Sequence, residues 1–301
     1  MNGLTDYITK ANWVDVFTIW YVLIDDAYQR LIQDMGHRLR KRGPEPTFTD
    51  SEVITLAVVI ETFFHGHEAL GVAFVDQYHR DLFPRLLHPS QFNRRRRALA
   101  RVMELIRRQL TNVLIDPQDR DRLIDSAPVP ACTYTRQNEC ETAVGMEYRG
   151  VVTSKRAKLY GHRFYATVTK SQVVDRWMIA PASYYEGKLM PEFFAEQANL
   201  FVLADNGFHS PPDIQWLAER RNITVATAKR KDAREPYPHW FRRLHRRMRR
   251  LIETAFSVMT VVFNLETPGA RSLSGLLCRL STTVLAYNLS LLTNEKLLSI
   301  E

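Results

Sequence analysis

The stretch Leu200-Phe201-Val202-Leu203-Ala204-Asp205-Asn206-Gly207 contains the pattern that decides the fold. An uninterrupted apolar run of this length, ended by a turn signal, is typical of a strand that is buried on both faces. The run stops at an acid, and Asn206-Gly207 then predicts a tight turn. Sheets of α/β proteins place reactive side chains at strand ends, where the buried strand meets solvent. The stretch therefore predicts an α/β fold with Asp205 at the edge of a sheet.

The segments on either side of this strand alternate between strand and helix. Upstream, residues 159–170 and 173–182 predict a β-hairpin, and residues 191–200 predict a helix. Downstream, residues 211–221 predict a helix that begins with two prolines, and residues 223–228 predict another strand. This order indicates a mixed sheet with helices on both faces.

A second acid follows an apolar strand earlier in the chain. Residues 122–126 predict a short strand, and Asp125 stands near its end in Leu-Ile-Asp-Ser. If the two strands are neighbours in the sheet, Asp125 and Asp205 lie close together. Taken singly, either aspartate is also explained as a turn-forming or capping residue.

A third acid lies on a long helix predicted over residues 239–264. With 100° per residue, one face of this helix is apolar and is expected to face the core. Glu253 lies at the end of an arginine stripe on the opposite face. It is either a carboxylate beside a metal site with arginines that hold DNA phosphates, or one partner of an ordinary surface ion pair. The apolar face comprises Leu244, Met248, Leu251, Ala255, Met259 and Val262, and the basic face comprises Arg242, Arg246, Arg249, Arg250 and Glu253.

Three acids suit phosphodiester chemistry. Cleavage needs an activated water and a stabilised leaving oxygen, and two Mg²⁺ ions about 4 Å apart supply both. Such hard cations prefer carboxylate oxygens. The sequence contains no HExxH or HxxxH spacing, and its three cysteines form no CxxC pair, which argues against a zinc site.

The first third of the chain predicts helices only. Residues 13–33 and 68–79 have helical periodicity, and Thr49-Asp50-Ser51-Glu52 has the pattern of a capping box. A long helix is predicted from Pro89 to about residue 115. We expect residues 1–118 to form a helical region with a helix-turn-helix that binds DNA. A supporting role for the catalytic domain, or a dimer interface, is the alternative.

Basic side chains are expected to bind the DNA backbone. The net charge of +8 and the pI near 9.5 indicate a polyanionic partner, with nucleic acid ahead of a membrane surface. Four successive arginines cover all sides of a helix, so at most two of them could face one backbone. A second basic cluster follows the last predicted strand. The candidate DNA-binding residues are Arg94, Arg95, Arg96, Arg97, Lys229, Arg230, Lys231, Arg242, Arg246, Arg249 and Arg250.

The composition favours an intracellular protein with no membrane partner. The three cysteines are too few and too widely spaced for a disulfide framework and suit the reducing cytoplasm. No signal peptide is predicted at the N-terminus. Residues 273–292 approach the length of a membrane span, but Arg279, Asn288 and several Ser and Thr interrupt the run, and its leucines recur at helical spacing. We interpret it as a helix packed on a core.

Several of these motifs together resemble the DDE transposases of bacterial insertion sequences. They are Asp125 in Leu-Ile-Asp-Ser-x-Pro-Val-Pro, Tyr160-Gly161-His162-Arg163-Phe164, Ala204-Asp205-Asn206-Gly207-Phe208, and residues 249–257 around Glu253. The N-terminal residues 49–55 and 92–96 and the C-terminal residues 270–289 are also similar to that family. The resemblance extends over nearly the whole chain.

This resemblance implies an RNase H-like catalytic domain over residues 119–301, including the C-terminal helix. It implies Asp125, Asp205 and Glu253 as the catalytic, metal-binding triad, and two Mg²⁺ ions, or Mn²⁺, as cofactor. It also implies hydrolysis at the ends of the element, followed by attack of the freed 3′-hydroxyl on target DNA. Two copies of the chain would pair the two DNA ends, which predicts a homodimer on DNA.

The resemblance is incomplete around the glutamate. Arg249 matches the arginine four residues before it in related elements. Arg246 and Thr260 stand where relatives often have a tyrosine and a lysine. Glu253 follows Asp205 by 48 positions, which leaves too little chain for a large inserted β-domain, so none is predicted. Two other functions stay open: a nuclease of the same fold that does not transpose, and an inactive or domesticated relative that only binds DNA.

Overall fold

The computed structural model describes residues 13–39, 43–152, 156–228 and 237–297. The chain divides into two compact units. The first, the helical unit, comprises Met1–Leu110, Val262–Asn264 and Ser274–Glu301. The second, the sheet unit, comprises Thr111–Val261 and Leu265–Leu273. The chain begins in the helical unit, forms most of the sheet unit over Thr111–Val261, and ends in the helical unit.

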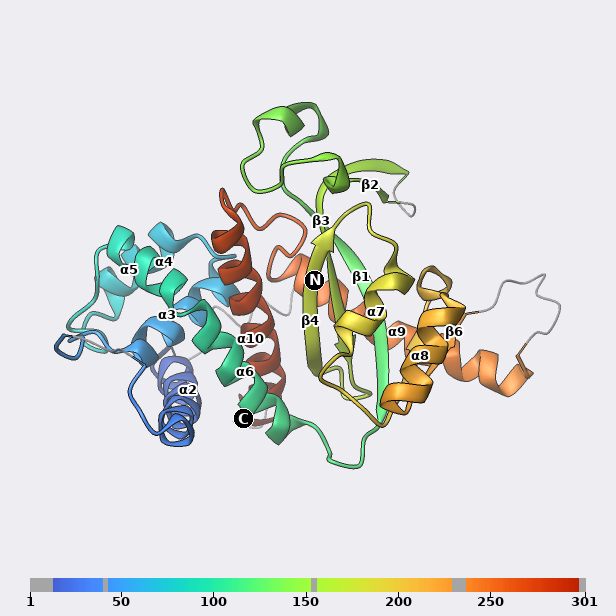
Figure 1. The fold of residues 1–301 in the computed structure, drawn as a ribbon. Helices are drawn as coiled ribbons and strands as arrows, with labels where there is room; N and C mark the ends of the chain where they lie inside the picture. The colour runs from blue at the N-terminus through green and yellow to red at the C-terminus, as the bar shows by residue number, and fades with distance from the viewer. Residues whose placement is uncertain (1–12, 40–42, 153–155, 229–236, 298–301) are drawn as a thin grey trace. The chain divides into compact units, whose positions relative to one another are not determined.

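The sheet unit contains a six-stranded mixed sheet in the order β2-β3-β1-β5-β6, with β4 paired to β3 outside this path (Figure 1). β1 is antiparallel to β3, and β3 is antiparallel to β2 and β4. β1, β5 and β6 are parallel to one another. This arrangement confirms the predicted RNase H-like sheet. The strands are β1 (Asp121–Pro130), β2 (Arg149–Val152), β3 (Ala157–Val168), β4 (Val174–Pro181), β5 (Leu200–Ala204) and β6 (Ile223–Thr227).

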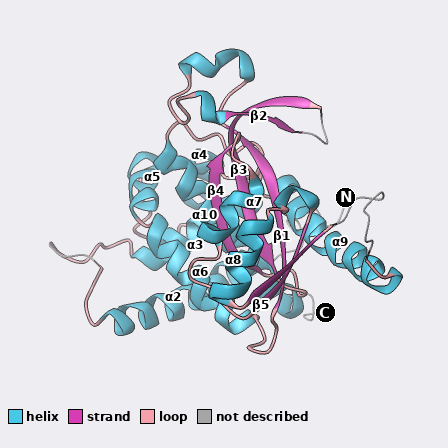
Figure 2. Cartoon of the chain, turned by 45° about the vertical axis from the view of Figure 1, so that its right-hand side comes forward, coloured by secondary structure: helices cyan, strands magenta, loops and turns pink. Residues whose placement is uncertain are grey.

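Helices cover both faces of this sheet, as predicted. α7 (Glu186–Phe193) and α8 (Pro211–Arg221) lie on one face, in front of the strands in Figure 2. Their apolar side chains form a core with Ile124, Val202 and Ala204 of the strands. α9 (His239–Val261) contacts β1, β3 and β5. Because successive side chains of a strand point to opposite faces, residues beside those in the α7–α8 core face α9.

Three elements of the sheet unit differ from the sequence prediction. The strand with Asp125 does not end there, because β1 continues to Pro130 along β3. The predicted helix at residues 191–200 is instead α7, which begins at Glu186 and contains Pro191. The strand β2 was not predicted, since its pairing with β3 is a tertiary contact that four residues cannot signal.

Gly161 lies at the point where β3 changes its pairing partner along one edge, from β2 to β4. Residues before it pair with β2, and residues after it pair with β4. Gly161 has a φ of +150°, and a Cβ there would lie 2.5 Å from the carbonyl oxygen of Val129. Only glycine combines this backbone conformation with such close approach of the neighbouring strand.

The helical unit is built around a nearly enclosed helix. α3 begins at the capping box that the sequence predicts: the Glu52 N–H donates to Thr49 Oγ1 at 3.1 Å, and the Thr49 N–H donates to the Glu52 carboxylate. Every residue of α3 from Val53 to Ile60 is fully buried. The unit contains α2 (Trp13–Met35), α3 (Asp50–Phe63), α4 (Glu68–Tyr78), α5 (Pro89–Ala98), most of α6 (Ala100–Leu114) and most of α10 (Leu273–Leu297).

One prediction about these helices is corrected. The long helix expected from Pro89 to residue 115 is two helices, α5 and α6, separated at Leu99. The contacts of α10 place nearly all of it in the helical unit. Leu280, Leu285 and Leu289 are fully buried there. An apolar helix signals that it needs a core, but its sequence does not say which one.

α10 is also the described helix with the composition closest to a membrane span. Over Leu273–Thr293 it is long and apolar enough to cross a bilayer, and 72% of that window is buried inside the protein. Among the described residues, α3 and α4 pass the same test only when taken together across a bend of 110°. Because most of this window is buried, the apolar composition of α10 is that of a core helix.

Candidate active site

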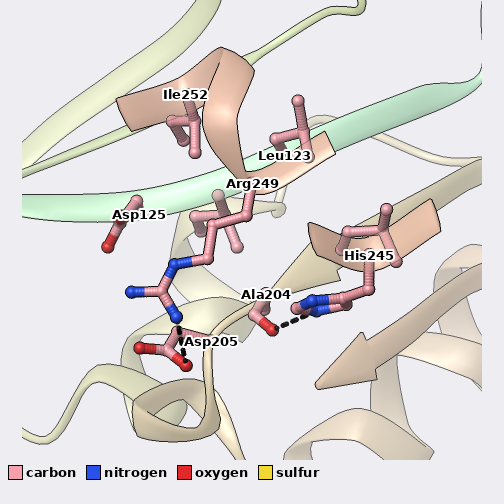
Figure 3. A pocket seen from close by; sticks show the side chains of 9 residues that line it. Leu123, Asp125, Ala204, Asp205, His245, Arg249 and Ile252 are labelled. Carbon is pink, nitrogen blue, oxygen red and sulfur yellow. Dashed lines mark hydrogen bonds and ion pairs between the residues drawn. The ribbon is translucent and has the colours of Figure 1, made fainter. Parts of the chain in front are cut away.

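The candidate site lies where β1 and β5 meet α9. Leu123 and Asp125 alternate with Ile124 along β1, and Leu203 and Asp205 alternate with Ala204 at the end of β5. The pairing of β1 with β5 stops at Ile124 and Ala204, so the sheet opens immediately beyond these residues, at the two aspartates. The pocket is lined by Leu123, Ile124, Asp125, Leu203, Ala204, Asp205, His245, Arg249 and Ile252 (Figure 3).

Both aspartates are held in the same way. The N–H of Ser126 donates to Asp125 Oδ1 at 2.8 Å, and the N–H of Asn206 donates to Asp205 Oδ1 at 2.7 Å. Each carboxylate is therefore oriented by the residue that follows it and keeps its other oxygen for a further partner. The sequence prediction that the two strands bring these acids into one site is consistent with this arrangement.

Arg249 connects the acids of the site. Its Nη1 lies 3.2 Å from Asp205 Oδ1, and its Nε donates to Glu253 Oε1 at 2.8 Å (Figure 3 draws the contact with Asp205). Burial lowers the pKa of Arg249, but the hydrogen bond to Glu253 and the charges of Asp205, Asp125 and Glu253 outweigh it and raise the pKa above its ordinary value. One guanidinium thus interacts with all three predicted catalytic acids.

Asp125 is the most perturbed carboxyl group of the site. Burial raises its pKa to about 6, against the lowering effects of the Ser126 N–H and the Arg249 charge. The charges of Glu186 and Asp205 raise the pKa further. Perturbation by desolvation together with neighbouring charges, in a pocket, is typical of functional carboxyl groups.

Two residues of the site were missed by the sequence analysis. His245 Nε2 lies 3.1 Å from the carbonyl oxygen of Ala204, directly before Asp205. Glu186 accepts a hydrogen bond from Ser126, directly after Asp125. His245 stands one helical turn before Arg249, which is a signal that the sequence contains. Glu186 could not be found, because the predicted helix began five residues too late.

The basic face of α9 is exposed, but its apolar face differs from the prediction. Arg242, Arg246 and Arg250 are exposed to solvent. Leu244 is 40% exposed rather than buried, and the first buried residue of the helix is Met248. The reason is that the first turns of α9 extend past the strands (Figure 1, right). The buried residues of α9 are Met248, Ile252, Ala255, Phe256 and Met259.

One of the four successive arginines of α5 is buried and cannot reach DNA. Arg96 is only 3% exposed and pairs with Glu61 and Glu68, so the prediction that it binds DNA is corrected. Arg95 donates to the Phe48 carbonyl oxygen and pairs with Asp50. Arg94 and Arg97 are exposed, and Arg97 donates to Ser274. The predicted residues Lys229, Arg230 and Lys231 lie outside the described residues.

The donor set fits a hard divalent cation by its chemistry. Arg249 pairs with Asp205 and Glu253, and its charge lowers the pKa of Asp125, so the guanidinium occupies a place that favours a positive charge. Within the described ranges, no group of three or more His, Cys, Asp or Glu side chains is placed closely enough to hold a metal ion. About half of each of the Asp205 and Glu253 side chains is exposed, at 41% and 52%, so solvent reaches both carboxylates.

A comparison with protein families agrees with this geometry. Residues 116–289, more than half of the chain, match the family model described as the transposase DDE domain. The chain belongs to the DDE transposases. The match begins just before β1 and ends within α10, so all three acids of this DDE transposase lie inside it. No curated protein matches the chain significantly.

Proposed function

We propose that this DDE transposase cleaves DNA hydrolytically at the ends of an insertion sequence and joins the freed 3′-hydroxyl to target DNA. The observation that carries the proposal is that Arg249 pairs with Asp205 and Glu253 beside the pocket that Asp125 also lines. These acids come from β1, β5 and α9, which are far apart in the sequence. A protein that only binds DNA gains nothing from acids at this place, because they repel phosphate.

Asp125, Asp205 and Glu253 are the residues that would hold two Mg²⁺ or Mn²⁺ ions. Such ions supply an activated water and stabilise the charge of the leaving oxygen. The protein's part is to orient the two aspartates through the N–H groups of Ser126 and Asn206. Arg249, when it leaves the carboxylates, can form a bidentate hydrogen bond to a phosphate of the DNA.

A plasmid assay tests the reaction. Purified protein is incubated with a supercoiled plasmid that carries the short inverted repeats flanking its gene, in Mg²⁺ or Mn²⁺. We expect cleavage at the repeat ends and products in which these ends are joined to other DNA, and no product in EDTA. Cleavage without joined products would instead identify a nuclease, and binding without cleavage would identify a DNA-binding protein. Since two ends must be paired, we also propose a dimer on DNA in the cytoplasm, which light scattering of the complex measures.

The exposed arginines of α9 are proposed to hold the DNA backbone. Each phosphate contact contributes about one unit to the slope of log K against log salt concentration. The double variant R242Q/R246Q is expected to bind repeat DNA more weakly and to lower this slope by about 2. Fluorescence anisotropy at several salt concentrations measures it.

The matched control removes the same charge elsewhere in the sheet unit. Arg120 precedes β1 and Arg220 lies on α8, and both are exposed. The variant R120Q/R220Q is expected to keep the wild-type slope. If R120Q/R220Q lowers the slope of log K against log salt concentration as much as R242Q/R246Q does, the DNA does not lie along α9.

A further inference from the structure

Glu186 connects the two segments that hold the site aspartates. It is the first residue of α7, on the face of the sheet opposite to α9. The hydroxyl of Ser126, directly after Asp125, donates to Glu186 Oε1 at 2.6 Å. Ser126 points away from α9 because side chains alternate along β1, so Glu186 reaches the strand from behind Asp125.

The other oxygen of the same carboxylate lies at the turn after Asp205. A Cβ at Gly207 would lie 2.2 Å from Glu186 Oε2, so glycine leaves the room that this carboxylate takes. The turn Asn206–Phe208 also carries the N–H that orients Asp205. A single carboxylate therefore contacts the residue after one aspartate and the turn after the other.

Glu186 is itself held in place. Arg163 Nη1 lies 3.5 Å from its Oε1, and the two side chains are only about a fifth exposed, at 19% for Arg163 and 21% for Glu186. Arg163 is anchored on β3 and donates through Nη2 to the Val151 carbonyl oxygen at 2.7 Å. Its Nε also donates to the carbonyl oxygen of Ala182, directly after β4, at 3.4 Å, so β2 and the end of β4 fix the position of Arg163.

We propose that Glu186 is a positioning residue of the active site, which sets the spacing of Asp125 and Asp205 and adds a fourth negative charge beside the cation-binding volume. The inference rests on the proposed function and deepens it, because it assigns a residue outside the triad to the same site. The geometry supports this role, because Glu186 contacts both the residue after Asp125 and the turn after Asp205.

Two substitutions distinguish the effect of the Glu186 charge from its effect on the spacing of Asp125 and Asp205. E186Q keeps the shape and an acceptor for the Ser126 hydroxyl but removes the charge. We expect the Mn²⁺ concentration at half-maximal plasmid cleavage to rise about tenfold, and the Mn²⁺ dissociation constant of the DNA-free protein, measured by calorimetry, to rise equally. E186D keeps the charge but is one methylene shorter, so we expect near-normal Mn²⁺ affinity and a several-fold lower rate at saturating Mn²⁺.

The matched control is E192Q, which removes an exposed carboxylate from the same helix. It is expected to equal the wild type in both measurements. G207A is a second variant that keeps every charge but places a methyl group against Glu186 Oε2, and it is expected to lower the rate as E186D does. Thermal unfolding of each variant in EDTA shows whether the fold is kept.

The outcomes distinguish this inference from the proposed function. Wild-type cleavage together with identical Mn²⁺ dependence of E186Q and E192Q would overturn the role of Glu186 and leave the transposase proposal standing. If the wild type cleaves no repeat DNA but E186Q still weakens Mn²⁺ binding relative to E192Q, the proposed reaction fails and the role of Glu186 at the cation site is supported.

Discussion

The substitution D125N is expected to abolish DNA cleavage while it stabilises the metal-free protein. Asparagine keeps the acceptor for the Ser126 N–H but lacks the charge that a divalent cation requires. We expect the rate of plasmid cleavage to fall at least about a thousandfold, as is typical when a member of a catalytic unit is removed. The gain in stability comes from the buried position of the carboxylate, which costs free energy in the absence of a cation.

The stability difference is expected to depend on pH in a defined direction. The pKa of Asp125 is about 6 in the folded protein, above the 3.8 of an ordinary aspartate. The folded state therefore binds this proton more tightly than the unfolded state, and stability is lost as the pH rises from about 4 through 6. D125N does not titrate, so its advantage should be absent near pH 4 and reach about 1–3 kcal/mol above pH 7.

Thermal unfolding in EDTA at several pH values measures this difference. Asp34, exposed near the end of α2, provides the control substitution D34N, which should match the wild type throughout. A D125N protein that is less stable than the wild type at pH 7.5 would contradict the burial argument. A D125N protein that still cleaves DNA would remove Asp125 from the triad.

The substitution R96A is expected to cost about 3–5 kcal/mol of unfolding free energy, because it leaves buried acids without their partner. Arg96 Nη1 lies 2.5 Å from Glu68 Oε1, and its Nη2 lies 3.5 Å from Glu61 Oε2. Glu61 is fully buried, and burial raises its pKa against the opposing charges of Arg279 and Arg96. Arg279 Nε, 2.9 Å from Glu61 Oε1, compensates only part of the charge.

The control for this prediction lies on the same helix. Arg94 is exposed, so R94A is expected to change the unfolding free energy by less than about 0.5 kcal/mol. Adding E61Q to R96A should recover part of the loss, since the uncompensated buried charge is then smaller. Urea unfolding measures all of these variants. An R96A protein within about 1 kcal/mol of R94A would show that the buried ion pairs contribute little.

The helices α9 and α5 show when a local sequence pattern predicts the exposure of arginine side chains and when it does not. On α9 the arginine stripe is exposed as its spacing predicts, because helical periodicity is a local property. On α5 four arginines in succession predicted a DNA-binding surface, but one of them is buried. The long-range partners Glu61 and Thr282 lie far from Arg96 in the sequence, so no local pattern could indicate them.

The sequence by itself determined the alternation of strand and helix around β5, the capping box at Thr49, and Asp205 at the end of its strand. These follow from propensity, periodicity and turn chemistry, which act over a few residues. Only the tertiary structure decided that β1 continues past Asp125, that α10 belongs to the helical unit, and that Glu186 and His245 reach the site. Those features depend on which surfaces become buried against each other. A strand shows where it can end, but its neighbours in the sheet decide where it does.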